Sequence, residues 1–497
     1  MKKSKKKVTP SQLNPRVPYS FLKDIVSKYK VSDLLLTLGQ LGPAYMSPEA
    51  SISLRTEIPP YAVAAIARES ILIGSETSKK IFTGFGLIKY FCKYFNLSYD
   101  GPKYVKNANR DPLSIIMRHA FEQFRYQESD FEELARSIAL FRFALAKTPK
   151  SGITKEQVDR ILNAPLEAAM SAAIGLYVVM IASRGIWLDN FASDPALSKL
   201  FSLVPGQSII NLKDQLAKTP QELQVHYSAV NTLRPVGPHL DRWRYNPLYA
   251  YPLVKLPNSV IVGPHLRLLL FKLSPNSLML MGSDTDSNFL SNMGLVIETY
   301  VGMQLELISG CRQIFPEVMW GATSDEGKSI DWFVVLPECI LMIEVKNAML
   351  SVAARAGDEN LLPDLKRIFN KARDQLNKTF TKFQEWHPSL TFLPRDRQII
   401  GIIVTATSMT FANSSLLRDE LISTEIPVLV MSLRDLEHFV PRPAEDLCHA
   451  IRLVVDDPEA MTYPSHVSVG KYLDNRQNPI LESAIDEIPI MKFVANL

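Results

Sequence analysis

The chain has 497 residues, of which 46% are hydrophobic and 21% are charged. This length exceeds one ordinary hydrophobic core, so we expect two or three globular domains, and the composition excludes a disordered or fibrous protein. The mean hydropathy of +0.01 argues against a polytopic membrane protein. Because 55 Lys and Arg face 51 Asp and Glu, a histone-like coat of positive charge is also excluded, and any nucleic-acid site must be a local patch.

Residues 1–17 form a basic arm that we expect to be flexible, with five lysines among the first seven residues. Such an arm either touches phosphates or is a solvated tail. No apolar segment follows it, so it does not resemble a secretory signal.

Four cysteines, Cys92, Cys311, Cys339 and Cys448, lack the paired short spacings of a zinc site or a disulfide framework. These features predict a reducing, cytoplasmic location.

Residues 18–230 predict an α-helical domain, because apolar residues recur at three and four spacing. Capping boxes are expected where a hydroxyl residue precedes an acid or amide by three positions, at Ser129, Thr154 and Thr219. The apolar segment Ala168–Ser183 is shorter than the roughly 20 residues needed to span a bilayer, so we expect a buried helix and no membrane partner. This domain lacks a cluster of metal-binding residue types and is a candidate for homodimer or protein-partner contacts.

Residues 231–285 predict a small β-rich connector, since prolines recur there and short apolar runs replace the helical period. Its segment Arg242–Tyr245 mixes cations and aromatic rings. That mixture is typical either of base stacking or of aromatic packing beside exposed arginines.

Residues 286–440 predict a compact α/β domain, and residues 441–497 a C-terminal extension with one short helix near 447–454. The pattern alternates between helical and strand periods. The expected helices are 287–309, 364–385 and 432–440, and the expected strands are 330–336, 339–346, 398–405 and 426–431.

The first two of these strands form a hairpin whose register follows from its turn. If Pro337 and Glu338 occupy the turn, Asp331 lies opposite Glu344, and Lys346 projects on the same face as Glu344. Directly opposed residues have Cβ atoms about 5 Å apart, so two carboxylates placed there repel each other unless something neutralises them. Oxygen ligands of this kind suit Mg²⁺, for which Mn²⁺ can substitute. The hairpin therefore predicts a metal site with an ammonium group beside it.

These residues resemble the motif of the PD-(D/E)xK nuclease superfamily, with Ile330-Asp331 followed by Glu344-Val345-Lys346 and the usual proline replaced by Ile330. The residues around the motif are most similar to those of the nuclease-related and Mrr-like branches. The resemblance covers about residues 286–440 only. It implies a restriction-endonuclease-like core, with a mixed central sheet flanked by helices, within an α+β multidomain chain.

The resemblance also implies two supporting residues, a glutamate on the first helix and a glutamine on the helix after the motif. Glu298 and Gln375 match these positions. Gly302, one turn after Glu298, predicts a close backbone approach at that helix. The helix of Gln375 is rich in cations, as a helix that faces phosphates requires. Its candidate nucleic-acid contacts are Lys366, Arg367, Lys371, Arg373 and Lys378.

Together these features predict a Mg²⁺-dependent nuclease that hydrolyses phosphodiester bonds, with DNA favoured over RNA and both left open by the sequence. Asp331 and Glu344 are the expected metal ligands, Lys346 the charge stabiliser, and Glu298 and Gln375 the supporting residues. Bacterial restriction or phage defence is a setting that the domain order suggests. The alternative is a catalytically inactive nuclease fold that serves as a nucleic-acid-binding or assembly module.

Overall fold

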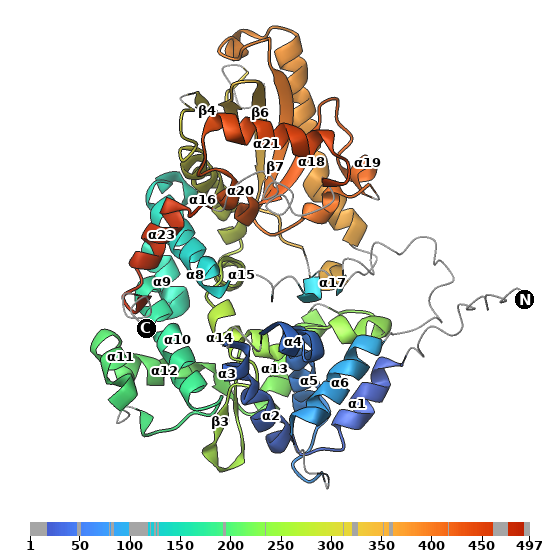
Figure 1. Ribbon diagram of the computed structural model, residues 1–497, viewed down its shortest axis with the longest axis vertical. Coiled ribbons are helices and arrows are strands. Elements are labelled where there is room, and N and C mark those ends of the chain that lie inside the picture. The colour runs from blue at the N-terminus through green and yellow to red at the C-terminus, as the bar shows by residue number, and fades with distance from the viewer. Residues whose placement is uncertain are drawn as a thin grey trace, which may run out of the picture. The chain divides into compact units, whose positions relative to one another are not determined.

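The computed structural model describes residues 17–491 except 47–50, 79, 81–83, 99–117, 120, 124–125, 127–128, 192–194, 234, 312, 321–326, 351, 357–360, 416 and 461–475. The expected basic arm therefore lies almost entirely outside the described residues. Helices and two mixed sheets make up the described part, so the predicted α+β class is confirmed (Figure 1). The chain divides into two compact units: unit 1 holds residues 1–128, 172–272 and 355–358, and unit 2 holds 129–171, 273–354 and 359–497.

Unit 1 is mainly helical. Its helices are α1 (Tyr19–Val26), α2 (Val31–Gly39), α3 (Leu41–Met46), α4 (Ser51–Glu57), α5 (Pro60–Ile73), α6 (Phe85–Leu97), α11 (Ser198–Leu203), α12 (Gly206–Leu216), α13 (Pro220–Leu233) and α14 (Arg267–Phe271). Fully buried leucine, isoleucine and phenylalanine side chains of α1, α2, α5 and α6 form its core. A small sheet of β1 (Ala217–Lys218), β2 (Leu253–Lys255) and β3 (Ile261–Val262) completes the unit.

The segment expected to be a β-rich connector, residues 231–285, contains only β2 and β3 as strands among its described residues. Three short 3-10 helices, Pro238–Trp243, Pro247–Tyr249 and Pro257–Ser259, each begin at a proline. Proline is favoured at the first position of a helix because its φ is fixed and its missing N–H is not needed there. The recurring prolines thus start short helices more often than they interrupt strands.

The apolar segment Ala168–Ser183 lies almost wholly within helix α10 (Leu166–Ala182), and Met170, Leu176 and Met180 are completely buried. By length and composition, residues 155–182 are one helical stretch apolar enough to cross a membrane, and 67% of its apolar window is buried inside the fold. A core helix of a water-soluble protein has the same composition.

Unit 2 holds a five-stranded sheet in the order β4 (Ile314–Pro316), β5 (Trp332–Val335), β6 (Cys339–Lys346), β7 (Gln398–Thr405) and β8 (Val428–Ser432). Its helices are α8 (Asp130–Ile138), α9 (Lys155–Leu162), α15 (Pro275–Thr285), α16 (Phe289–Leu305), α18 (Leu361–Gln384), α19 (Arg418–Leu421), α20 (Leu433–Phe439), α21 (Ala444–Asp456) and α23 (Pro479–Asp486). A π-helical stretch, Ala139–Ala144, continues α8, and a short helix, α17 (Val352–Arg355), precedes α18.

The strands β4, β5 and β6 form an antiparallel meander, whereas β7 runs parallel to β6 and β8 parallel to β7. Strands β6, β7 and β8 are buried along almost their whole length, so both faces of this part of the sheet are covered. Helices α16 and α18 pack against β6, and α20 packs against β7 and β8. Every helix and strand expected within 286–440 is confirmed to within a few residues, and the helix expected near 447–454 is part of α21. Elements that were not expected are β4, α17, α19 and α23.

All three expected capping residues begin helices, and the complete capping box, with both hydrogen bonds, forms at Thr219. The Ser129 hydroxyl accepts a hydrogen bond from the Glu132 N–H at α8, and Thr154 does the same for Gln157 at α9. At α13, the Thr219 N–H donates to the Glu222 carboxylate at 2.8 Å. Satisfying these first N–H groups fixes where each helix starts.

Residues 129–171 pack in unit 2, although the sequence assigned them to the helical half. The physical reason is a buried ion pair: the Arg136 guanidinium on α8 donates to both oxygens of Glu437 on α20, at 2.7 and 2.9 Å from Nε. Tyr300 on α16 donates to the same carboxylate at 2.7 Å. Asn478, in the C-terminal extension, donates to the Glu437 carbonyl at 2.9 Å. A buried guanidinium needs such partners, so these segments fold together.

Candidate metal centre

The β5–β6 hairpin brings the two predicted ligands together. Trp332 pairs with Ile343, and extending this register by one residue places Asp331 opposite Glu344, as the sequence predicted. Both carboxylates are nearly inaccessible, with exposed fractions of 5% and 4%. One Asp331 oxygen accepts a hydrogen bond of 2.7 Å from the Val345 N–H, which fixes the side chain against the neighbouring strand.

A third carboxylate, Glu317, enters from the strand on the other side. Pro316 of β4 pairs with Trp332 of β5, so the next residue, Glu317, lies opposite Asp331. Asp331 is thus the middle member of a row of three acids across three adjacent strands. Glu317 was not predicted from the sequence, because β4 has only three residues, one of them a proline. The apolar pair Ile314-Phe315, just ahead of Pro316, was the available signal for a third strand.

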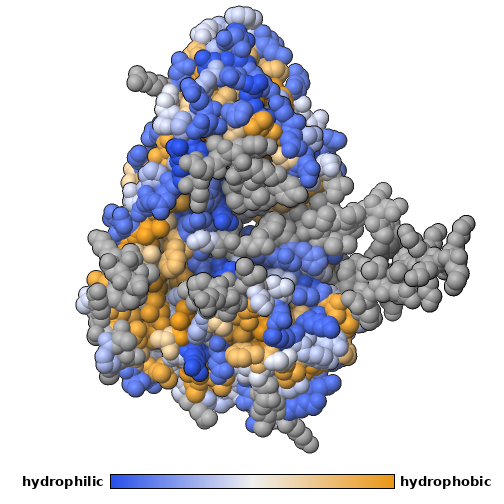
Figure 2. Space-filling model, viewed as in Figure 1, coloured by the Kyte–Doolittle hydropathy of each residue, from blue (hydrophilic) through white to orange (hydrophobic). Residues whose placement is uncertain are grey.

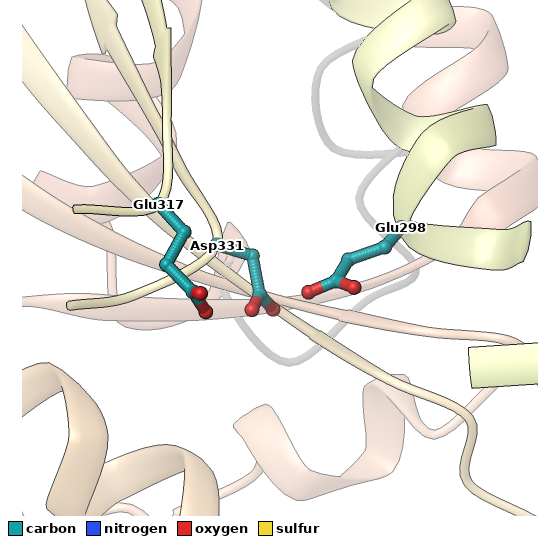
Figure 3. Close-up of side chains that lie close together, drawn as sticks. All are labelled: Glu298, Glu317 and Asp331. Carbon is teal, nitrogen blue, oxygen red and sulfur yellow. The ribbon is translucent and has the colours of Figure 1, made fainter. Parts of the chain in front are cut away.

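Helix α16 supplies the fourth acid, Glu298. The Trp332 indole N–H donates to the Glu298 carbonyl at 3.1 Å, and a methyl group added at Gly302 would overlap the Trp332 ring. This glycine therefore permits the predicted close approach of helix and strand. Figure 3 shows the Glu298, Glu317 and Asp331 carboxylates converging from one helix and two strands; one oxygen of each lies within 4.8 Å of the others.

Burial and mutual repulsion perturb these acids strongly. Burial, followed by the hydrogen bond with Asp331 and its charge, raises the pKa of Glu298 to about 9. Burial, followed by the Asp331 charge, raises the pKa of Glu344 to about 8. Glu344 Oε2 is buried and has no hydrogen-bond partner among the described residues. Raised pKa values and an unsatisfied buried oxygen indicate that the positive charge near these acids does not balance their negative charge when they are ionised.

Two lysines partly supply that charge. Lys346 contacts the Oε1 atom of Glu344, as its register on β6 predicted. Lys328 pairs with Glu317 and lies 3.9 Å from Asp331 Oδ1. Four ionised carboxylates and two ammonium groups would leave two negative charges, which equals the charge of one divalent cation.

The donor set fits a hard divalent cation. Among the described residues, the possible ligand atoms that converge here are carboxylate oxygens. Mg²⁺ and Mn²⁺ prefer such ligands together with water and phosphate oxygens. The residues whose oxygens converge closely enough to hold an ion are Glu298, Glu317 and Asp331. The second expected ligand, Glu344, lies opposite Asp331 but is not part of this set of three.

Gln375 lies on α18 beside the segment that leads into Asp331. Its side-chain amide donates to the carbonyls of Lys328 and Ser329, the second at 2.6 Å. One turn further along α18, the buried Thr379 hydroxyl accepts a hydrogen bond of 3.1 Å from the Ile330 N–H. The predicted supporting residue therefore holds backbone next to the acids and does not touch the carboxylates itself. Thr379 has the same function and was not predicted.

The cations predicted on α18 divide into two groups. Lys366 pairs with Glu420 at 2.8 Å, and Arg373 pairs with Asp374 at 2.8 Å. The other three lie on the exposed face of the helix; they are Arg367, Lys371 and Lys378. Arg367 is 3.8 Å from Asp364. A side chain added at Gly327 would collide with the Lys378 ammonium, so Lys378 lies next to the turn that precedes Asp331.

No family model, curated protein or solved structure matches this chain.

Proposed function

We propose that this protein is a metal-dependent nuclease that hydrolyses phosphodiester bonds, with DNA as the favoured substrate. The observation that carries the proposal is the convergence of the Glu298, Glu317 and Asp331 carboxylates. Glu344 lies opposite Asp331 in the β5–β6 register, and the Lys346 ammonium pairs with it. A purely structural sheet edge would gain nothing from crowding buried acids, because like charges at these separations are destabilising.

The order of elements supports a PD-(D/E)xK-like core. Helix α16 is followed by the antiparallel meander β4–β5–β6, then by α18 and by β7, which is parallel to β6. This is the order that the superfamily resemblance implies, and the acids stand at its motif positions. Ile330 replaces the usual proline and is fully buried, so this position contributes packing.

Each residue has a distinct part in the reaction that we propose. Asp331 and Glu344 hold the cation, supported by Glu317 and Glu298. Bound Mg²⁺ would supply Lewis-acid stabilisation of the phosphate and a more acidic water. The Lys346 ammonium stabilises negative charge that develops on the scissile phosphate. Gln375 and Thr379 hold the backbone at 328–330, which keeps the Asp331 carboxylate in place.

Cleavage of supercoiled plasmid and linear duplex DNA, with Mg²⁺ or Mn²⁺, tests the proposal. We expect cleavage by the wild type, and a loss of about 100-fold or more for Asp331→Ala and for Lys346→Ala. Glu338→Gln is the matched control, because Glu338 lies in the turn of the same hairpin and its side chain is 65% exposed. Activity that survives both site substitutions would refute the assignment.

The same preparations address the alternative, a nucleic-acid-binding or assembly module without catalysis. That module would bind DNA with a steep salt dependence and leave it intact at every cation concentration. Titrating RNA beside DNA of the same length identifies the preferred nucleic acid.

A further inference from the structure

Trp386 is an unusual residue at the end of α18. Its side chain is 70% exposed, the largest exposure of any aromatic ring among the described residues. Its backbone has a φ of 59°, in the left-handed region that residues with a Cβ rarely adopt. Glycine or asparagine normally ends a helix in this conformation. Trp386 is therefore disfavoured both by the exposure of its large apolar ring and by its left-handed backbone. Such outliers are often found at functional positions.

One face of the ring is supported by a cation. The Arg395 guanidinium lies 4.3 Å from the centroid of the Trp386 ring and 3.9 Å from that of Phe383. Arg395 also donates to the Phe383 carbonyl, so its guanidinium is held in place. With one face stacked on Arg395 and most of the side chain exposed, the remaining ring surface faces solvent as a flat apolar platform.

Positive charge leads from this platform toward the acids. Arg367, Lys371, Lys378 and Lys382 recur at intervals of four, seven and four residues, which puts them within one stripe of α18. Lys382 also pairs with Glu385 at 2.9 Å, and Asp374 lies within the stripe. At the top of the view, the surface of unit 2 is mostly hydrophilic, with hydrophobic residues among the hydrophilic ones (Figure 2).

The spacing suits a nucleic acid strand. Gln375 marks the part of α18 beside the acids, and Trp386 follows the last turn of the same helix. At 1.5 Å per residue this separation is about 15 Å, the length of a few nucleotides. Aromatic rings beside cationic grooves bind single strands because every base has a π-face that can stack.

We propose that Trp386, supported by Arg395, is a stacking platform for an unpaired nucleobase of a strand whose phosphates run along α18. This inference rests on the proposed function, and it specifies the substrate class as nucleic acid with a single-stranded, frayed or flipped segment near the cut. Paired bases inside a duplex are already stacked and offer the platform no free face.

Fluorescence anisotropy of the full-length protein with labelled oligo-dT tests the platform, in EDTA so that no cleavage occurs. We expect Trp386→Ala to bind oligo-dT about 5- to 100-fold more weakly than the wild type. An abasic oligomer of the same length keeps the phosphates and lacks the bases, so the two proteins should bind it equally. A blunt duplex should likewise show little difference.

Three further variants separate stacking from charge and from folding. Trp386→Phe retains a ring and should recover most of the oligo-dT affinity. Trp386→Gly suits the left-handed backbone, so it should leave the melting temperature unchanged or higher while still losing affinity for oligo-dT. Lys371→Ala should weaken the binding of oligo-dT and of the abasic oligomer alike, with a shallower salt dependence.

Equal binding of oligo-dT by wild type and Trp386→Ala would overturn the platform, and so would an equal loss on the abasic oligomer. Because binding is measured without a divalent cation, this result is independent of the cleavage assay. Trp386-dependent binding with no cleavage would support the platform and refute hydrolysis. Cleavage together with binding that does not depend on Trp386 would support hydrolysis and refute the platform.

Discussion

Unit 2 contains two buried charge clusters that differ in how completely they are satisfied. Around Glu437, the Arg136 guanidinium and the Tyr300 hydroxyl donate four hydrogen bonds to one carboxylate. Around Asp331, four acids share two lysines, and Glu344 Oε2 has no partner among the described residues. The first cluster joins α8, α16 and α20; the second joins α16 to three strands.

The difference indicates what each cluster does. A structural ion pair stabilises a fold only when its polar atoms are satisfied, and removing one partner is then costly. A site that must accept an external cation needs acids in excess, and the excess raises their pKa values while the cation is absent. The Asp331 cluster has acids in excess, as a cation site requires, and five predictions test the contrast.

The largest expected effect on stability belongs to the satisfied cluster. Arg136→Met would leave Glu437 and Glu133 buried without their counter-charge, so we expect a loss of about 3–5 kcal/mol in the free energy of unfolding. Urea denaturation followed by circular dichroism measures this loss.

Lys346→Met is the matched change at the other cluster. Its partner Glu344 has a raised pKa and can take up a proton when the ammonium is removed, so we expect a loss below about 1 kcal/mol. Equal losses for the two variants would remove the distinction between a structural and a functional cluster.

The next effect is stabilisation by a divalent cation. A cation at 100 times its dissociation constant stabilises the folded state by about 2.7 kcal/mol, or roughly 5–10 °C in melting temperature for a domain of this size. We expect this shift with MgCl₂ or MnCl₂ for the wild type and for Glu338→Gln, and not for Asp331→Asn. A similar shift for Asp331→Asn, at matched ionic strength, would place the cation elsewhere.

Much of unit 2 follows from its sequence because its signals are local. The apolar runs at 339–346 and 398–405 predict the observed bounds of β6 and β7, and the two-residue turn predicts the register that opposes Asp331 to Glu344. Gly302 and Glu298 likewise share one helix face, so their proximity to β5 could be expected.

The features that were not predicted depend on contacts between distant segments. Glu317 takes its place only because β4 pairs with β5, and β4 by itself is too short to recognise. Cys339 and Cys448 are 109 residues apart in the chain, yet their sulfur atoms lie 3.1 Å apart between β6 and α21. Arg136 and Glu437 are separated by 301 residues. Sequence periodicity carries no information on such pairs.

The pH dependence of stability distinguishes the clusters further. Below about pH 4.5 Glu298 is protonated in both the folded and unfolded protein. As the pH rises toward its folded pKa of about 9, only the unfolded state releases the proton, so this group lowers stability progressively and the loss is complete above that pH.

Glu298→Gln should remove this loss in the metal-free protein. We expect a gain of the order of 1 kcal/mol at pH 9, allowing for partial exposure of the side chain, and almost none at pH 5. Melting temperatures across pH 5–9 measure the gain, and Glu306→Gln, an exposed acid at the end of the same helix, is the control. A gain that is independent of pH would show that Glu298 is not protonated in the folded protein.

A small effect on stability is also expected from Gln375, which lies between the acids and the cationic stripe of α18. Gln375→Ala removes two hydrogen bonds to the 328–329 backbone, so we expect a loss of about 1 kcal/mol in stability. Because that backbone carries Asp331, cleavage should also slow by about tenfold, in kcat and not in KM. Thr381→Ala, an exposed change on the same helix, should alter neither quantity. If Gln375→Ala lowers the melting temperature and leaves kcat unchanged, Gln375 has a structural function like that of Glu437. The functional cluster would then not include Gln375.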